Sequence, residues 1–280
     1  MPLPGGLPRD GRLRRDYRFR PLTGVQERIL ADSGYQAQHL PQQVTAVLAG
    51  SLAELAGMAV DEGLVRLLSC GDREYLVLQL AALIDPAPRW VTADCNGCGE
   101  PIQFQVSPQA VPFKAAGEGY PEASADLSIG EARLRVPCGA DEEFIAVQQS
   151  DTGVESLLLS RLLTSAGEPV PVECLSRADL EQLDQLLDRM SPQAGLSAGV
   201  DCPHCGLAQA MPIDPYDWLL DDSGTLDREI HTLAFHYHWS EQDILALPRA
   251  RRVRYLELID QSLGKYRADD LIQGSHGGRW

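Results

Sequence analysis

The feature that most constrains this chain is a cysteine hairpin motif that occurs twice, 107 positions apart. The first copy reads ADCNGCGEPIQFQVSP from Ala93, and the second reads VDCPHCGLAQAMPIDP from Val200. Both copies carry Asp, Cys, Cys, Gly, a β-branched residue and Pro at the same offsets. The stretch after each C-x-x-C-G turn predicts a β-strand. We therefore expect the two segments to fold as equivalent halves of one small structure.

The spacing of these cysteines predicts metal ligands. Two cysteines in a tight C-x-x-C turn span one edge of a tetrahedron, and Zn²⁺ prefers four ligands in that geometry. The glycine after each second cysteine permits the left-handed backbone that such a turn needs. A site with four thiolates has no position for water, so the expected zinc is structural and not catalytic. The predicted ligands are Cys95, Cys98, Cys202 and Cys205.

Two other interpretations of the cysteines stay open. A dithiol redox protein would place its C-x-x-C between a strand and a helix, whereas strands are predicted after both pairs here. Four unrelated structural cysteines are the other alternative. The three remaining cysteines lie in apolar contexts and are expected to be small buried residues. They are Cys70, Cys138 and Cys174.

Composition and motifs argue against several function classes. The net charge of −16 disfavours broad nucleic-acid binding, because phosphate contacts need a basic surface. The chain has no apolar run of membrane-spanning length and no secretory h-region, so we expect a cytoplasmic protein without a membrane partner. It also lacks a P-loop, a G-x-S-x-G motif and a dinucleotide-binding fingerprint. An enzyme with a small-molecule substrate is therefore not expected.

Hydrophobic periodicity predicts an α+β fold in which the two hairpins form a zinc ribbon and an α/β segment is inserted between them. Helices are expected over 41–57, over 71–84 with Asp72 as the cap, and over 177–190 behind a capping box of Ser176 and Asp179. The expected organisation is an extended basic arm (1–20), a helical region (21–90), the first half of the ribbon (91–111), an inserted domain (112–197), the second half of the ribbon (198–216) and a C-terminal helical docking module (217–280).

The C-terminal module contains an arginine-rich helix that begins near Pro248. Its arginines allow an alternative function, a zinc-ribbon regulator that binds nucleic acid. Apolar residues at helical spacing within the same helix favour docking to a protein partner instead. The residues predicted to bind partners are Arg249, Arg252, Arg254, Tyr255 and Trp239.

Three stretches of the chain together resemble a known family. FRPLTGVQERIL resembles the R-P-[LM]-T-G-x-x-E stretch of T4-type baseplate hub proteins in contractile phage tails. LLSCGDREYLVLQL resembles the G-D-R-x-x-L-L-x-L segment that precedes a C-x-x-C knuckle in those proteins. HYHWSEQDILALPRARRVRYLELI is similar to small proteins encoded with contractile tails and contractile injection systems.

The resemblance implies a non-enzymatic baseplate or assembly protein that is incorporated into a contractile tail-like particle. Its implied partners are other baseplate, hub or spike proteins. The chain departs from the family in two ways, since its insert is long and the C-terminal module, which is otherwise a separate small protein, is fused here. Both departures leave open whether it stays in the particle or leaves after assembly.

Overall fold

The computed structural model describes residues 2–28, 39–148, 153–216 and 225–273, with side chains to residue 264. The chain forms two compact units. Unit 1 comprises Met1–Arg20 and Asp32–Asp221, and unit 2 comprises Pro21–Ala31 and Asp222–Trp280. Helices and antiparallel strands occur together in unit 1, which agrees with the expected α+β class. None of the described helices is both long enough and apolar enough to cross a membrane.

The N-terminal segment is folded into unit 1, so the expectation of an extended arm is wrong. β1 (Leu7–Arg9) and β2 (Arg12–Arg14) form a hairpin, and β3 (Tyr17–Phe19) pairs with β4 (Leu52–Leu55). The arginines dominate the composition of this segment, but Leu3 and Leu7 are buried in the core. Burial of these two leucines, rather than the charge of their neighbours, decides the structure of the segment.

Three helices make the body of unit 1: α2 (Leu40–Ser51), α3 (Glu62–Arg66) and α4 (Cys70–Ile84). The helix expected over 41–57 ends at Ser51, because the next residues pair with β3 and bury Leu52 and Leu55. The N-cap of α4 is Ser69, whose side chain accepts a hydrogen bond from the N–H of Asp72. The carboxylate of Asp72 is therefore left for another contact.

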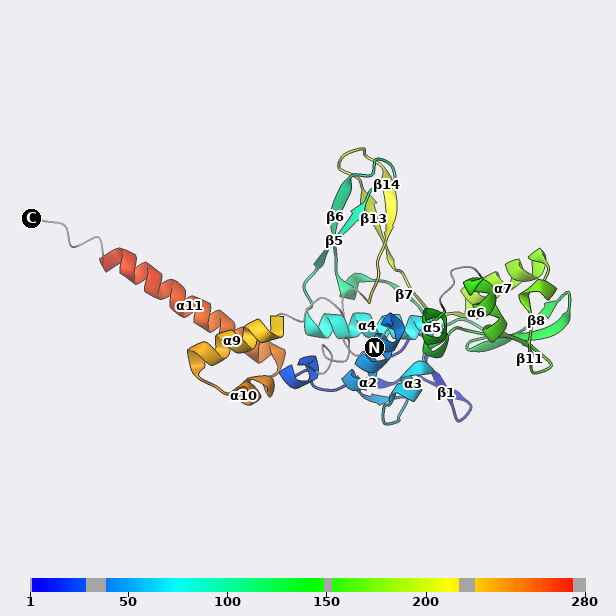
Figure 1. Ribbon diagram of the computed structural model, residues 1–280, viewed down its shortest axis with the longest axis horizontal. Coiled ribbons are helices and arrows are strands. Elements are labelled where there is room, and N and C mark those ends of the chain that lie inside the picture. Colours follow the sequence, from blue (N-terminus) through cyan, green and yellow to red (C-terminus); the bar gives the residue numbers. More distant parts are fainter. Residues whose placement is uncertain (1, 29–38, 149–152, 217–224, 274–280) are drawn as a thin grey trace, which may run out of the picture. The chain divides into compact units, whose positions relative to one another are not determined.

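Both predicted cysteine hairpins form. In Figure 1 they stand side by side, and their buried faces share one hydrophobic cluster with Leu78 and Ala81 of α4. Each hairpin is a separate two-stranded antiparallel sheet. The strands are β5 (Arg89–Asp94) with β6 (Pro101–Val106), and β13 (Ser197–Asp201) with β14 (Ala208–Pro212).

The segment between the hairpins is an insertion with a core of its own. Its ends meet where β7 (Phe113–Lys114) pairs with β12 (Gln193–Ala194), just after the first hairpin and just before the second. Its sheet has the order β11-β10-β9-β8 with antiparallel pairing. The strands of this sheet are β8 (Glu122–Leu127), β9 (Gly130–Arg135), β10 (Leu163–Ser165) and β11 (Glu168–Pro169). The helices of the insert are α5 (Gly139–Ala146), α6 (Val154–Leu162) and α7 (Arg177–Met190). A 3-10 turn, η1 (Pro108–Ala110), precedes the insert, and a second, η2 (Val172–Cys174), lies within it.

The insert is not independent of the rest of unit 1. Helix α5 packs against α2, α3 and α4. The buried guanidinium of Arg73 on α4 forms an ion pair with Glu142 on α5, with Nε and Oε2 2.7 Å apart. The backbone carbonyl of Pro192 lies so close to Gly71 of α4 that a Cβ there would meet the oxygen at 2.1 Å. The insert therefore has its own apolar core and also a fixed contact with the helices.

Unit 2 is helical. Residues 24–28 are helical, and they are followed much later in the chain by α9 (Thr225–Tyr237), α10 (Glu241–Leu245) and α11 (Arg249–Gln273). Ser240 caps α10, because its side chain accepts a hydrogen bond from the N–H of Asp243. The buried hydrophobic residues described in this unit form one apolar cluster, which is Ile230, Leu233, Ile244, Leu245 and Ile259.

Candidate metal centre

The turns of the two hairpins bring all four predicted ligands together. The Sγ atoms of Cys95, Cys98, Cys202 and Cys205 lie within 4.8 Å of one another. In the described part of the chain, they form the one group of three or more metal-ligating side chains at this spacing. The first cysteine of each turn is buried and the second is exposed.

The closest thiols belong to opposite hairpins. Cys95 and Cys205 have their sulfurs 3.7 Å apart, and Cys98 and Cys202 have theirs 3.8 Å apart. A tetrahedral ion with metal–sulfur bonds of about 2.3 Å requires sulfurs about 3.8 Å apart. A disulfide needs about 2.05 Å, so these pairs are not disulfides. The two closest sulfur–sulfur separations therefore match those of a tetrahedral metal site, and all four thiols lie near enough to be its ligands.

The two turns repeat the same backbone hydrogen bonds. Cys95 N–H donates to the carbonyl of Glu100, and Cys202 N–H donates to that of Leu207, both at 2.9 Å. The glycine after each second cysteine has a left-handed backbone, with φ of 73° at Gly99 and 75° at Gly206. The prediction from the C-x-x-C-G spacing is confirmed at both turns.

Gln209 breaks the symmetry between the hairpins, and sequence reasoning missed it. Its side chain accepts a hydrogen bond from the N–H of Asn96 at 2.9 Å and donates one to the sulfur of Cys95 at 3.3 Å. The equivalent position in the first hairpin is Ile102, which is buried in the apolar cluster. A polar residue opposite an apolar one in the aligned hairpins is the signal that identifies it.

The thiols have unequal acidities because they share a small volume. The backbone N–H groups of Cys98 and Gly97 lower the pKa of Cys95 to about 6. At Cys98 the N–H of Glu100 favours the thiolate, but desolvation and the neighbouring thiols outweigh it and raise the pKa to about 12. A thiolate that is already present in the cluster therefore disfavours ionisation of the neighbouring thiols. A divalent cation removes that opposition and favours the thiolate at every position.

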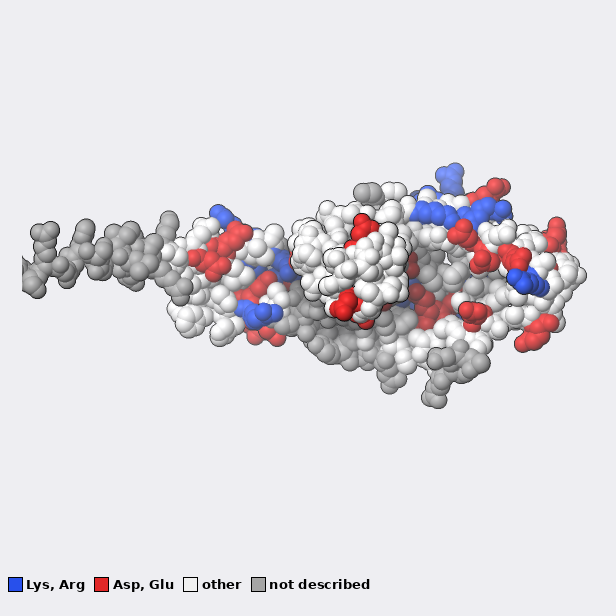
Figure 2. Space-filling model, turned by 90° about the horizontal axis from the view of Figure 1, so that it is seen from above, with Lys and Arg blue, Asp and Glu red and all other residues white. Residues whose placement is uncertain are grey.

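The sequence around the thiols carries no Lys or Arg side chain, and no helix begins at either turn. No Lys or Arg occurs between Trp90 and Val106 or between Ser197 and Pro212. Figure 2 looks down on the hairpins, where the surface is white with red patches. Both C-x-x-C turns connect two strands, and neither lies at a helix N-terminus, where a redox thiolate is usually stabilised.

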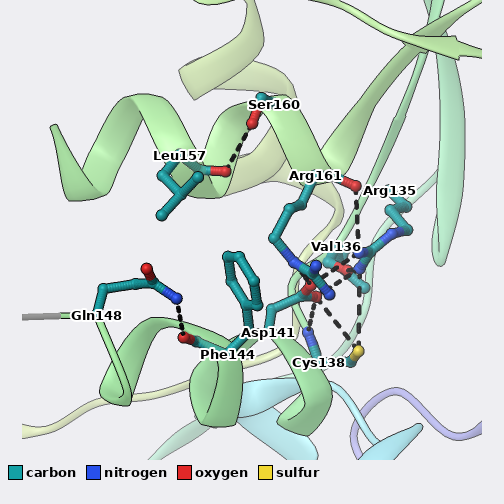
Figure 3. Close-up of polar contacts among 9 residues, drawn as sticks. All are labelled: Arg135, Val136, Cys138, Asp141, Phe144, Gln148, Leu157, Ser160 and Arg161. Carbon is teal, nitrogen blue, oxygen red and sulfur yellow. Dashed lines mark hydrogen bonds and ion pairs between the residues drawn. The ribbon is translucent and has the colours of Figure 1, made fainter.

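Cys138 belongs to a different polar cluster, which Figure 3 shows. It is the N-cap of α5, and its thiol donates to the carboxylate of Asp141 at 3.3 Å. The same carboxylate forms ion pairs with Arg135 and Arg161. Desolvation and the charge of Asp141 raise the pKa of Cys138, so this thiol is not an activated nucleophile. Contrary to expectation, Cys138 and Cys70 are only partly buried and Cys174 is exposed.

The structure corrects one predicted partner-binding residue. Arg252 has no exposed surface and forms ion pairs with Glu27 and Glu229 inside unit 2. An arginine in this position stabilises the unit and cannot touch a partner directly. Arg254 is exposed and pairs with Glu257 on its own helix.

The other residues predicted to bind partners stay predictions. Trp239 and Tyr255 pack edge to face, with ring centroids 4.9 Å apart, beside the apolar cluster of unit 2. Both are half-buried, as is Arg249.

The chain was compared with protein-family models, with curated proteins and with solved structures, and none of the three comparisons gives a match.

Proposed function

We propose that the chain is a non-enzymatic structural or assembly protein that is stabilised by one structural Zn²⁺ ion. The ligands are Cys95, Cys98, Cys202 and Cys205. The observation that carries the metal is the separation of 3.7 and 3.8 Å between sulfurs of opposite hairpins, which fits a tetrahedral ion. Thiolate sulfur is a ligand that zinc favours. Four thiolates leave no coordination position for a substrate, so the ion cross-links the chain.

A cross-link at this point would add to the apolar cluster that the two hairpins share. Each hairpin is a two-stranded sheet, and an isolated hairpin of that size is only marginally stable in water. The insert separates the two in sequence, so the chain alone joins them weakly. Metal binding contributes directly to the free energy of folding in such sites, by on the order of 10 kcal/mol in zinc-finger peptides.

We infer further that the protein belongs to the baseplate of a contractile tail-like particle, where its partners are other baseplate, hub or spike proteins. This proposal rests on the three stretches that resemble that family and on their order in the chain. The motif residues occupy structural positions, as a non-enzymatic role would require. Asp72 and Arg73 are fully buried in unit 1, and Glu27 pairs with a buried arginine in unit 2. Buried charged residues of this kind stabilise the fold of the unit that contains them.

Metal analysis tests the zinc. Protein purified without chelators should contain about one zinc per chain, and Cys202→Ser should lose it and melt at lower temperature. Cys174→Ser is the matched control, because Cys174 is exposed and lies outside the cluster. A fully folded protein without metal, or a Cys202→Ser variant that melts like its parent, would contradict the structural role.

Electron microscopy tests the role in the particle. Cells that lack the chain should assemble no complete contractile particles, and the wild-type gene should restore them. Complete particles in cells without the chain would contradict the proposal. Tagged protein that copurifies with finished particles would identify a permanent component, whereas its absence from them would identify an assembly factor. Retention on DNA at physiological salt would favour the nucleic-acid regulator instead.

A further inference from the structure

A short N-terminal segment is a structural part of the C-terminal unit. Strand β3 ends at Phe19 in unit 1, whereas Pro21–Ala31 belongs to unit 2 together with residues about 200 positions later. The chain returns to unit 1 at Asp32. The described part of this excursion, residues 21–28, contains a helix from 24 to 28. This segment contacts α9, α10 and α11 through particular side chains and backbone groups.

A glycine lets the segment approach α10 closely. A Cβ at Gly24 would meet Cδ2 of Leu245 at 2.9 Å, its Cα at 3.0 Å and Nη1 of Arg252 at 3.2 Å. The Cα cannot rotate away as the tip of a side chain can, so a larger residue would push the segment off the helix. The N–H of Gly24 donates to the carbonyl of Leu247 at 3.3 Å, and Thr23 forms a β-bridge with Pro248.

A buried ion pair fixes the register of the segment. Nη2 of Arg252 contacts a carboxylate oxygen of Glu27, while Nε contacts Glu229 of α9 at 2.8 Å. Nη1 of the same guanidinium donates to the carbonyl of Leu247 at 2.9 Å. All three nitrogens of Arg252 are therefore used, and one of its two carboxylate partners comes from the segment. Removal of Glu27 leaves a buried, partly unpaired charge.

Surface ion pairs extend the same contact. Arg28 pairs with Asp227 at the start of α9 and with Glu241 at the start of α10. The two acids lie in the first turns of their helices, where negative charge is already favoured. The segment thus presents glycine, glutamate and arginine in the order T-G-x-x-E-R, and each meets a complementary group.

The C-terminal helices do not use the described part of this segment for their own core. Their cluster of buried apolar residues is drawn from α9, α10 and α11, and it includes none of residues 21–28. Val25, the one β-branched aliphatic residue of the short helix, is exposed. The segment is held by ion pairs, by hydrogen bonds and by close packing of its backbone at Gly24 against α10.

We propose that α9, α10 and α11 form a recognition module for a short helix of sequence T-G-x-x-E-R, and that its ligand is this chain's own residues 21–28. The module binds the segment non-covalently and specifically, so the connection through residues 217–224 is not needed to keep the two together. Through this contact, the C-terminal helices hold residues 21–28 in a defined register.

The test is cleavage of the folded, full-length protein. A protease site is introduced within residues 217–224, which lie outside the described residues, and the chain is cut after purification. The released C-terminal fragment should co-elute with the remainder in gel filtration. Gly24→Leu and Glu27→Lys should each release it, with the apparent Kd raised roughly 100-fold or more. A leucine at position 24 would clash with the backbone of Leu245, and loss of Glu27 leaves the buried charge of Arg252 partly uncompensated. Both substitutions lie on the segment, outside the apolar cluster of the module.

Two control variants make the result specific. Val25→Ala changes an exposed residue of the same short helix, and Gly264→Ala adds a methyl group where no atom lies within 4 Å. Both should co-elute like the parent. Separation of the fragments in the cleaved parent protein would overturn the proposal. Retention of the fragment by Gly24→Leu and Glu27→Lys would overturn it equally, since the two parts would then be held by other contacts.

Discussion

Asp72 accepts a hydrogen bond from the backbone N–H of Gly5 at 2.7 Å, across 67 positions of sequence. Its other oxygen accepts the N–H of Gly6 at 2.9 Å, so one buried carboxylate anchors the N-terminal segment to α4. Asp72→Ala leaves both donors buried and unpaired, which costs about 1–3 kcal/mol for each. We expect a loss of about 3 kcal/mol in urea unfolding. Asp184→Ala, at an exposed helical position, should change little; equal stability of the two variants would contradict the anchor.

The N-terminal segment should also stabilise unit 1 through its leucines. Leu3 is only 1% exposed, whereas Leu13 in the adjoining hairpin is 37% exposed. Leu3→Ala should lower the free energy of unfolding by about 3 kcal/mol, as large-to-small substitutions in a core do. Leu13→Ala should cost less than about 0.5 kcal/mol. The same denaturation assay compares the two, and a Leu3→Ala variant as stable as the parent would restore the idea of a free arm.

Local patterns were sufficient where the determining residues are close in sequence. The C-x-x-C-G turns formed as expected, and Ser176 and Asp179 make the capping box that begins α7. Asp72 was expected as the cap of α4, but Ser69 holds that position because its hydroxyl is free to bond the third helical N–H.

Long-range contacts could not be read from the sequence. An arginine among other arginines resembles a solvated helix face, and nothing local indicates that Arg252 is paired with Glu27, 225 positions away. The N-terminal arginines similarly conceal two buried leucines. Gln209 was missed for a related reason, since its partners Asn96 and Cys95 lie on the opposite hairpin.

Asp141 should give the protein an acid-sensitive contact. Burial alone would raise its pKa, but hydrogen bonds from Arg135 and from the Cys138 N–H outweigh burial and lower the pKa to about 2. Because the folded-state pKa is below the unfolded value of about 3.9, the contribution is complete above pH 4 and is lost as the pH falls toward 2. Asp141→Asn should therefore cost about 2 kcal/mol at pH 7 and much less near pH 2.

Urea unfolding at several pH values checks this prediction. Asp126→Asn is the control, because Asp126 is exposed on β8. A cost of Asp141→Asn that is the same at pH 7 and pH 2.5 would show that the ion pairs with Arg135 and Arg161 do not stabilise the fold.

Glu74 should have the opposite dependence on pH. Burial, together with the nearby charge of Glu142, raises the pKa of this α4 carboxyl to about 7. A raised folded-state pKa means that stability is greatest below the unfolded value of about 4.3 and falls as the pH rises to 7. Glu74→Gln should remove this cost and be more stable than the parent at pH 8, by on the order of 2 kcal/mol, with little difference at pH 4.

The measurement is again unfolding as a function of pH, with Glu118→Gln as the exposed control. If Glu74→Gln lowers stability at pH 8, the ionised carboxylate is stabilised by its surroundings, and the direction inferred from burial is wrong.

The last prediction concerns Gln209 and depends on the proposed zinc. Its amide nitrogen donates to the sulfur of Cys95, and its oxygen fixes the turn through Asn96. Partners that orient a metal ligand in this way typically contribute 10- to 100-fold to affinity. We expect Gln209→Ala to bind zinc about 10-fold or more weakly in competition with a chromogenic chelator, while still binding one equivalent. Gln103→Ala is the matched control, because Gln103 is exposed on the first hairpin and its amide donates to the hydroxyl of Thr92 rather than to a cysteine. If both variants release zinc at the same chelator concentration as the parent, the four thiolates hold the ion without help from Gln209. If Gln209→Ala binds no zinc and is unfolded, its role is to position the first turn during folding, and the affinity effect is not separable from stability.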